Sequence, residues 1–166
     1  MTPTGADGWV VEPVTRSDFL AILTDIRAFW PNGAPAVFHP LFVEEFGDTA
    51  FVIRDQGQVV AHLFGLIAAT SPTGYIHLVA VRDGYRGRGL ARTLYDHFAS
   101  VARARGATRL KAITNPGNAG SLAFHRRLGF TFEGEPNEHG VPVVRDYAGP
   151  GVDRVVMVRD LPRSEP

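Results

Sequence analysis

Apolar residues recur along this chain with two different periods, and the change from one period to the other predicts the order of its elements. A helix that Ser17 caps is predicted where apolar residues return every three or four positions, until Pro31 ends it. Further helices are predicted at 41–46, 89–103 and 118–128. Runs of β-branched and aromatic residues between turn-forming residues predict strands. The predicted strands are 9–14, 49–54, 58–69, 75–81, 108–114, 130–133 and 154–159.

The order of these elements combines hairpins with one strand–helix–strand unit. The turn Asp55-Gln56-Gly57 joins two strands into a hairpin, whereas the helix 89–103 connects two strands across a longer path. This order predicts an α/β (α+β) fold with a mixed central β-sheet and helices on both faces. A chain of 166 residues is expected to form a single domain, 1–166, with a loose N-terminus at 1–8. The segment 134–151, rich in Pro and Gly, is predicted to be a long functional loop.

The composition of the chain argues against several classes of protein. The formal net charge is zero, which argues against a nucleic-acid partner, and no run of about 18 apolar residues predicts a membrane span. The chain has no cysteine, which excludes a disulfide framework and a thiolate metal site and fits a cytoplasmic location. No signal peptide is recognisable at the N-terminus. The histidines lack metal-ligand spacing, so no metal is expected.

The stretch from Val79 to Ala91 (V-A-V-R-D-G-Y-R-G-R-G-L-A) carries the strongest functional signal. A strand runs into an Arg/Gly turn, and the turn runs into a helix. Glycine lets the backbone approach a ligand, and a helix start offers N–H groups without partners. This predicts a seat for a phosphate or pyrophosphate. A dinucleotide-binding turn would need a third glycine where Arg92 stands. A triphosphate-binding loop would need a Gly-Lys-Ser/Thr ending, which this stretch lacks. A solvated loop without a ligand is the remaining alternative.

Two motifs resemble the GNAT acyltransferases, the general-control-related N-acetyltransferases. The first is R-x-x-G-x-A, from Arg86 through Gly89 to Ala91, which resembles the family's acyl-CoA loop. The second lies downstream at the family's spacing and consists of Asn118, Ser121, Phe124, His125, Leu128, Gly129 and Phe130. The resemblance covers about 49–132 well. It implies a partly splayed sheet of about six to seven strands, a GNAT-like acyl-CoA fold, and acetyl-CoA as the acyl donor without a metal.

The resemblance also implies where the donor binds. The pyrophosphate would lie on the backbone amides of the turn, and the pantetheine arm would pair with the preceding strand like an added strand. The implied cofactor-binding residues are Val79, Ala80, Val81, Arg86, Gly87, Arg88, Gly89, Leu90, Ala91, Asn118 and Ser121. Asn118, Ser121 and His125 fall on one helical stripe and are expected to face the same ligand.

His125 and His77 are the predicted catalytic residues. His125 stands where the family usually has the tyrosine that protonates the departing sulfur, and a half-buried structural role is the alternative. His77 lies in H-L-V-A-V, which resembles the strand where arylalkylamine-type members use a histidine to draw off the amine proton, partly through water. Strand alternation predicts that Tyr75, His77 and Val79 share a face. Other candidate bases are His62, Glu44 and Glu45.

The predicted function is transfer of acetyl from acetyl-CoA directly to a primary amine of a small molecule or peptide. The alternatives are a catalytically silent acyl-CoA-binding module and an O-acyltransferase. The resemblance implies that an early and a late segment wall the acceptor site, and the residues expected there are Trp30, Phe38, His39, Asp146 and Tyr147. Small members of the family often pair, so a homodimer is left open. The acceptor itself is not readable from the sequence.

Overall fold

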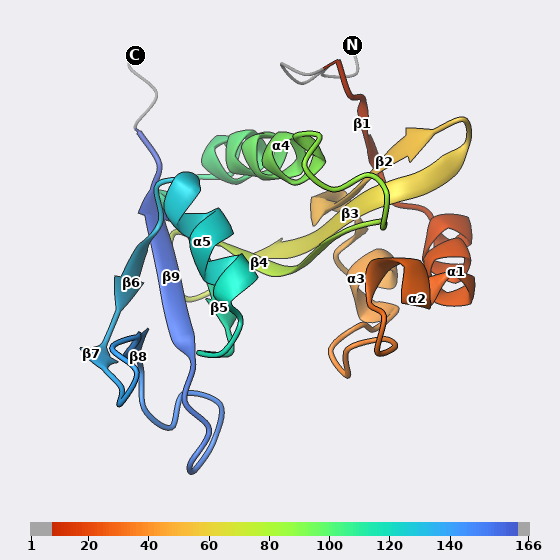
Figure 1. Ribbon diagram of the computed structural model, residues 1–166. Helices are drawn as coiled ribbons and strands as arrows, with labels where there is room; N and C mark the ends of the chain where they lie inside the picture. Colours follow the sequence, from red (N-terminus) through yellow and green to blue (C-terminus); the bar gives the residue numbers. More distant parts are fainter. Residues whose placement is uncertain (1–7, 163–166) are drawn as a thin grey trace.

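The computed structural model describes residues 8–162, in which a seven-stranded mixed sheet separates two groups of helices (Figure 1). The strands, in their order across the sheet, are β1 (Val11–Pro13), β2 (Ala50–Asp55), β3 (Gln58–Ile67), β4 (Thr73–Val81), β5 (Arg109–Thr114), β9 (Val155–Asp160) and β6 (Thr131–Glu133). The helices are α1 (Arg16–Thr24), α2 (Ile26–Phe29), α3 (Leu41–Glu44), α4 (Leu90–Ala104) and α5 (Ala119–Arg127), with a 3-10 turn at Gly47–Thr49. β4 and β5 run parallel and the other neighbours are antiparallel, so the predicted mixed sheet is confirmed.

The start of the chain differs from the prediction in three places. The first strand is only three residues long, and Thr15 rather than Ser17 caps the first helix. The single helix predicted to run as far as Pro31 is divided at Asp25 into α1 and α2. The Thr15 hydroxyl accepts a hydrogen bond from the Asp18 backbone N–H, while the Asp18 carboxylate accepts one from the Thr15 N–H at 2.8 Å. This reciprocal capping box satisfies two backbone donors at once, which Ser17 cannot do from inside the first turn. Most of the predicted loose terminus lies outside the described residues.

The long segment after β6 contains two short strands, although it is rich in Pro and Gly. Strands β7 (Glu135–Pro136) and β8 (Pro142–Val143) form a small separate hairpin, and Val144 bridges to Arg154 beyond it. The remaining turn is held by Asp146 and Asp153, whose carboxylates accept backbone N–H bonds at 2.6 and 2.9 Å. The segment 134–151, predicted to be a long functional loop, therefore includes a short hairpin in its first half.

Two apolar cores lie on opposite faces of the sheet. One face packs against α4 and α5, with Leu94, Tyr95 and Phe98 fully buried between helix and strands. The other packs against α1, α2 and α3 through Phe19, Phe42 and their neighbours. Burial of this apolar surface is the main stabilising contribution, and it fixes helices on both faces as predicted. No helix in 8–162 has the length and apolar character that crossing a bilayer requires.

A bulge in β4 opens the sheet at its centre. Phe64 pairs with Leu78 and Gly65 pairs with Ile76, so His77 has no partner on β3. On the other side, β4 pairs with β5 only as far as Ile76 and Ala112, although both strands continue. A bulge adds a residue to one strand and increases its local twist, which carries the rest of β4 away from β5. The partly splayed sheet that the resemblance implied is confirmed.

Candidate functional site

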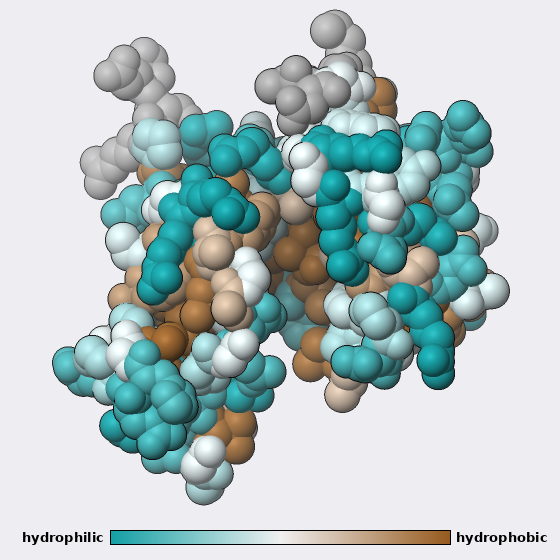
Figure 2. Space-filling view, in the orientation of Figure 1, coloured by the Kyte–Doolittle hydropathy of each residue, from teal (hydrophilic) through white to brown (hydrophobic). Residues whose placement is uncertain are grey.

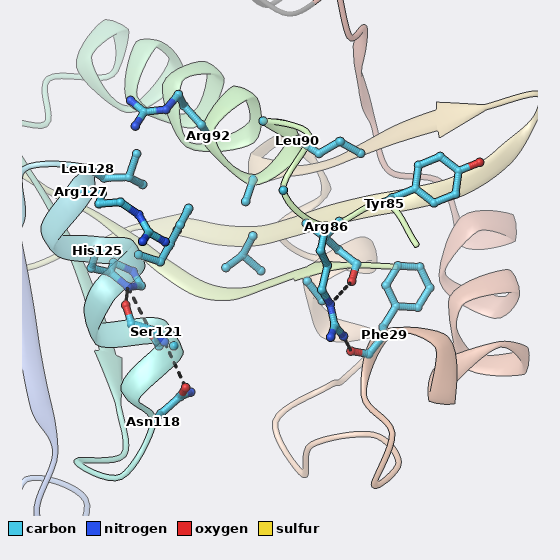
Figure 3. Close-up of a pocket in the computed structure, with 18 of the residues that line it drawn as sticks. Phe29, Tyr85, Arg86, Leu90, Arg92, Asn118, Ser121, His125, Arg127 and Leu128 are labelled. Atoms are coloured by element: carbon cyan, nitrogen blue, oxygen red, sulfur yellow. Dashed lines mark hydrogen bonds between the residues drawn. The ribbon is translucent and has the colours of Figure 1, made fainter. Parts of the chain in front are cut away.

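A cleft of about 610 Å³ lies where β4 separates from β5. Figure 2 shows the hollow as a brown, apolar floor between two polar shoulders. Its walls are the end of β4, the glycine turn, the first turn of α4, one side of α5, and Phe29 and Trp30 at the end of α2. Figure 3 shows α4, α5 and the turn around Arg86 lining it from separate directions. The opening of the sheet and the convergence of these elements therefore create one site.

The backbone of the turn requires glycine where the ligand seat was predicted. Gly87 and Gly89 have φ angles of +77° and +82°, a region that residues with a Cβ rarely adopt. Gly89 precedes α4 without capping it through a side chain, so the N–H groups of the helix's first turn point past it. The positive end of the helix dipole lies at the same place. Backbone donors and dipole together favour an anion here.

Side chains hold the turn against α2. Arg86 donates from its guanidinium to the backbone oxygen of Phe29 at 3.3 Å and to that of Val81 at 3.4 Å. Arg82 binds the Asp25 carboxylate at 2.6 Å and lies over the Phe29 ring. The arginines of the motif thus position the turn as well as carrying charge.

The predicted cofactor residues come together with one exception. Val79, Ala80, Val81, Arg86, Gly87, Gly89, Leu90, Ala91, Asn118 and Ser121 all line the cleft. Arg88 does not: its guanidinium lies over the Tyr85 ring, and its backbone oxygen accepts a bond from the Trp9 indole. Sequence reasoning missed Phe29, Tyr85, Gly120 and Arg127 as lining residues. Phe29 comes from α2, which only the tertiary fold brings to the turn, whereas Arg127 lies on α5, the helix that the sequence already placed at the ligand.

His125 lines the cleft and is 3% exposed. Its Nδ1 lies 2.8 Å from the Ser121 backbone oxygen, which can only accept, so Nδ1 carries the hydrogen. Nε2 therefore accepts, and its partner is the Tyr95 hydroxyl at 2.7 Å. Burial lowers the pKa of His125 below its usual 6.5, although the Ser121 bond opposes this, and the neutral ring is favoured at neutral pH. Tyr95, fully buried on α4, was not anticipated.

His77 lies outside the cleft lining, on the side of the sheet that α3 covers. Its ring stacks on Phe42 with centroids 4.2 Å apart, and its Nε2 donates to the Val37 backbone oxygen at 3.1 Å. Burial lowers the pKa of His77. The prediction that Tyr75, His77 and Val79 share a face was wrong for Val79, which packs into the opposite core. The bulge at His77 breaks the alternation on which that prediction relied.

The other candidate bases are committed elsewhere or exposed. His62 is completely buried among Phe29, Trp30, Phe38 and Phe64, and neither of its ring nitrogens has a hydrogen-bond partner. Glu44 forms an ion pair with Arg16 at 2.7 Å, and Glu45 is exposed. No cluster of three or more potential metal ligands occurs among the residues from 8 to 162.

The sheet opens between two parallel strands, and a glycine turn followed by a helix start lies beside the opening. This combination is characteristic of the acyl-CoA transferase folds. Comparison with known proteins agrees: the Acetyltransferase (GNAT) family matches residues 18–130. The chain belongs to this family.

Several acetyltransferases are similar to this chain in sequence. L-2,4-diaminobutyric acid acetyltransferase of Streptomyces coelicolor is 40% identical over 102 residues, 57% of this chain and 60% of that protein. Mycothiol acetyltransferase of Beutenbergia cavernae is 37% identical over 75% of this chain and 44% of its own length. The matched part thus spans less than two thirds of these relatives.

Solved structures share the fold at low identity. Ard1 from Thermoplasma volcanium superposes with a TM-score of 0.74 at 16% identity, covering 93% of this chain and 99% of the other. Phosphinothricin acetyltransferase from Sinorhizobium meliloti, solved with AcCoA, has a TM-score of 0.66 at 19% identity and covers 92% and 88%. At this identity the likeness concerns the fold alone.

Proposed function

We propose that this protein transfers the acetyl group of acetyl-CoA to a primary amine. The observation that carries the proposal is the edge of β4 after Ile76, which faces the cleft without pairing to β5. Backbone N–H and C=O groups in a strand need partners, and the amides of a pantetheine arm can supply them. The residues present therefore fit the donor: Val79 to Val81 would hold the arm, and the backbone of Gly87, Gly89, Leu90 and Ala91 would hold the pyrophosphate.

The acceptor is proposed to be a small molecule or a peptide with a free amine. This follows the names of the relatives, which include acetyltransferases of L-2,4-diaminobutyric acid and of L-methionine sulfoximine in bacteria and an N-alpha-acetyltransferase in fission yeast. The bound donor supplies an activated thioester carbonyl, and the amine attacks it directly. A cytoplasmic location stays a prediction, and a homodimer, which the sequence left open, is not part of the proposal.

His77 is proposed to accept the proton that the amine loses, directly or through a water. Because Nε2 donates to Val37, the lone pair of Nδ1 is the one available for a proton. The lowered pKa keeps the ring neutral at neutral pH, which is the form that a base needs.

His125 is proposed to assist the departing sulfur. A doubly protonated ring is scarce at neutral pH because burial lowers the pKa of His125, so the ring carries one hydrogen, on Nδ1. The Ser121 backbone oxygen already accepts this hydrogen, so the sulfur would have to share it. Tyr95 keeps that hydrogen on Nδ1 by donating to Nε2. A neutral imidazole that donates a hydrogen bond is an established electrophile in other enzymes.

The test is release of free thiol from acetyl-CoA with a panel of primary amines that contains L-2,4-diaminobutyric acid, amino acids, aminated sugars and short peptides. Amine-dependent release, with the acetylated amine found by mass spectrometry, is the expected result. Thermal stabilisation by CoA is measured alongside. Thermal stabilisation by CoA without thiol release for any amine would indicate a catalytically silent acyl-CoA-binding module instead of an enzyme. Absence of both stabilisation and thiol release would refute the proposal.

A further inference from the structure

Lys111 is the single lysine among 17 basic residues, and it lies on β5 directly opposite Tyr75 of β4. The pair stands one position before Ile76 and Ala112, where the two strands part. Register partners on neighbouring strands project to the same side of a sheet, so the lysine and the tyrosine share a face at the start of the opening.

One aromatic ring contacts the Lys111 ammonium, and two more lie along the neighbouring strand β4. The Lys111 Nζ lies 5.1 Å from the centroid of the Tyr147 ring, which the late loop carries. Tyr75 lies 6.1 Å, ring to ring, from His77. Burial, with Tyr147 close by, raises the pKa of Tyr75 to about 12, so its hydroxyl stays protonated. The loop, β4 and β5 therefore meet around one ammonium group and two phenols, beside the proposed base.

The charge of Lys111 has no protein counterion in 8–162. None of the described carboxylates forms an ion pair with it, whereas Arg16, Arg54, Arg82 and Arg105 each pair with Asp or Glu. The acids of the late loop are engaged by backbone, since Asp146 binds the Gly151 N–H and Asp153 binds the Asp146 N–H. A half-buried lysine whose ammonium packs on an aromatic ring can bind an anion more strongly than an exposed one can, because water screens it less.

We infer that Lys111 binds a carboxylate of the acceptor, so that the acceptor belongs to the class of amino acids and related amines that carry a carboxylate. Tyr147 would cover the bound acceptor from the loop, and the Tyr75 hydroxyl would add a donor. Along β4, His77 stands between Tyr75, whose ring is 6.1 Å from it, and Val79, which lines the cleft. The inference rests on the proposed acetyl transfer and names the substrate class for it.

The experiment compares L-2,4-diaminobutyric acid with its carboxamide, which has the same amines and lacks the negative charge. The measured quantity is the ratio of kcat/KM for the acid to kcat/KM for the carboxamide, in the wild type and in Lys111→Met. Intrinsic differences in amine reactivity cancel when the two ratios are compared. The ratio is expected to fall about 10- to 100-fold in the variant, mainly through KM for the acid.

Two further variants make the comparison specific. Lys111→Arg keeps the charge and is expected to retain most of the ratio. Arg109→Met removes a neighbouring positive charge from the same strand, where the guanidinium donates to the Thr73 hydroxyl, and is expected to leave the ratio near the wild-type value. Melting curves with and without CoA confirm that each variant is folded.

The outcomes separate the two proposals. An equal ratio in the wild type and Lys111→Met would overturn the role of Lys111. Wild-type turnover of carboxylate-free amines alone, across the panel described above, would overturn the substrate class while acetyl transfer stands. If no amine releases thiol although CoA binds, the proposed function itself fails and this inference fails with it.

Discussion

His62 offers the sharpest test of the energetics of this fold. Its ring is completely buried among four aromatic side chains, and neither nitrogen has a hydrogen-bond partner. Loss of hydration lowers its pKa from 6.5 to about 3, so the ring is neutral in the folded protein. Replacement by leucine, which has a similar volume, removes both unsatisfied nitrogens. The His62→Leu variant is expected to be more stable by about 1–3 kcal/mol near neutral pH.

The same substitution should remove part of the pH dependence of folding. Between its folded and unfolded pKa values His62 binds protons only in the unfolded chain, so the free energy of unfolding falls as pH falls below 6.5. From these pKa values the loss is about 2 kcal/mol between pH ~7.5 and pH ~5, and it reaches about 4 kcal/mol at pH ~3. His97 and His125, whose pKa values burial also lowers, contribute in the same direction in both proteins.

The assay is urea unfolding of the wild type and of His62→Leu at pH ~7.5 and at pH ~5. The change in the free energy of unfolding between these two pH values is expected to be about 2 kcal/mol smaller in the variant than in the wild type. His139→Leu is the control, because this exposed imidazole lies outside the core and its removal should leave the difference intact. An unchanged difference in His62→Leu would show that the ring is hydrated or hydrogen-bonded in solution, and the reasoning from burial would fail.

Three other perturbations have defined outcomes. Gly65→Ala should destabilise the fold by about 1–3 kcal/mol in urea unfolding, because the new Cβ would lie 2.6 Å from the Phe98 ring. Gly47→Ala is the control, because a Cβ there meets no atom within 4 Å. Equal destabilisation by the two substitutions would contradict this reasoning. Gly89→Trp should abolish thermal stabilisation by CoA by blocking the approach to the backbone, and a folded variant with full stabilisation would disprove the proposed seat. His125→Ala should lower kcat by about 10²-fold with little change in KM for acetyl-CoA, and a raised KM at unchanged kcat would reassign the residue to positioning.

Local patterns predicted the parts of the fold that local physics determines. The turn at Gln56 and Gly57 has both φ angles positive, as a tight hairpin between two right-twisted strands requires, and the sequence Gln-Gly between β-branched runs indicates it. The strand, glycine turn and helix around Gly89 followed from residue types alone. The cap of α1 was misplaced although the signal was present, since Thr15 and Asp18 have capping-box spacing.

The chemistry of the site depends on partners that are distant in sequence. Tyr95 and His125 lie 30 positions apart, and only the packing of α4 against α5 shows that the tyrosine hydroxyl determines which imidazole nitrogen carries hydrogen. Val37 plays the corresponding part for His77 across 40 positions. A single sequence can place a histidine in a motif, but its tautomer and burial come from the tertiary fold.

The bulge at His77 links the opening of the sheet to the placement of the proposed base. It turns the end of β4 away from β5, which exposes a strand edge to the cleft, and the same extra residue brings the imidazole onto Phe42 of α3. Beside it, Gly65 and Gly74 leave no room for a Cβ under α4, because a Cβ at either glycine would lie less than 3 Å from a side-chain atom of that helix. Close packing of α4 over these glycines fixes the height of its first turn relative to the open edge of β4. The donor seat and the proposed base are therefore positioned by one local distortion, and a change that restores regular pairing of β4 should disturb both together.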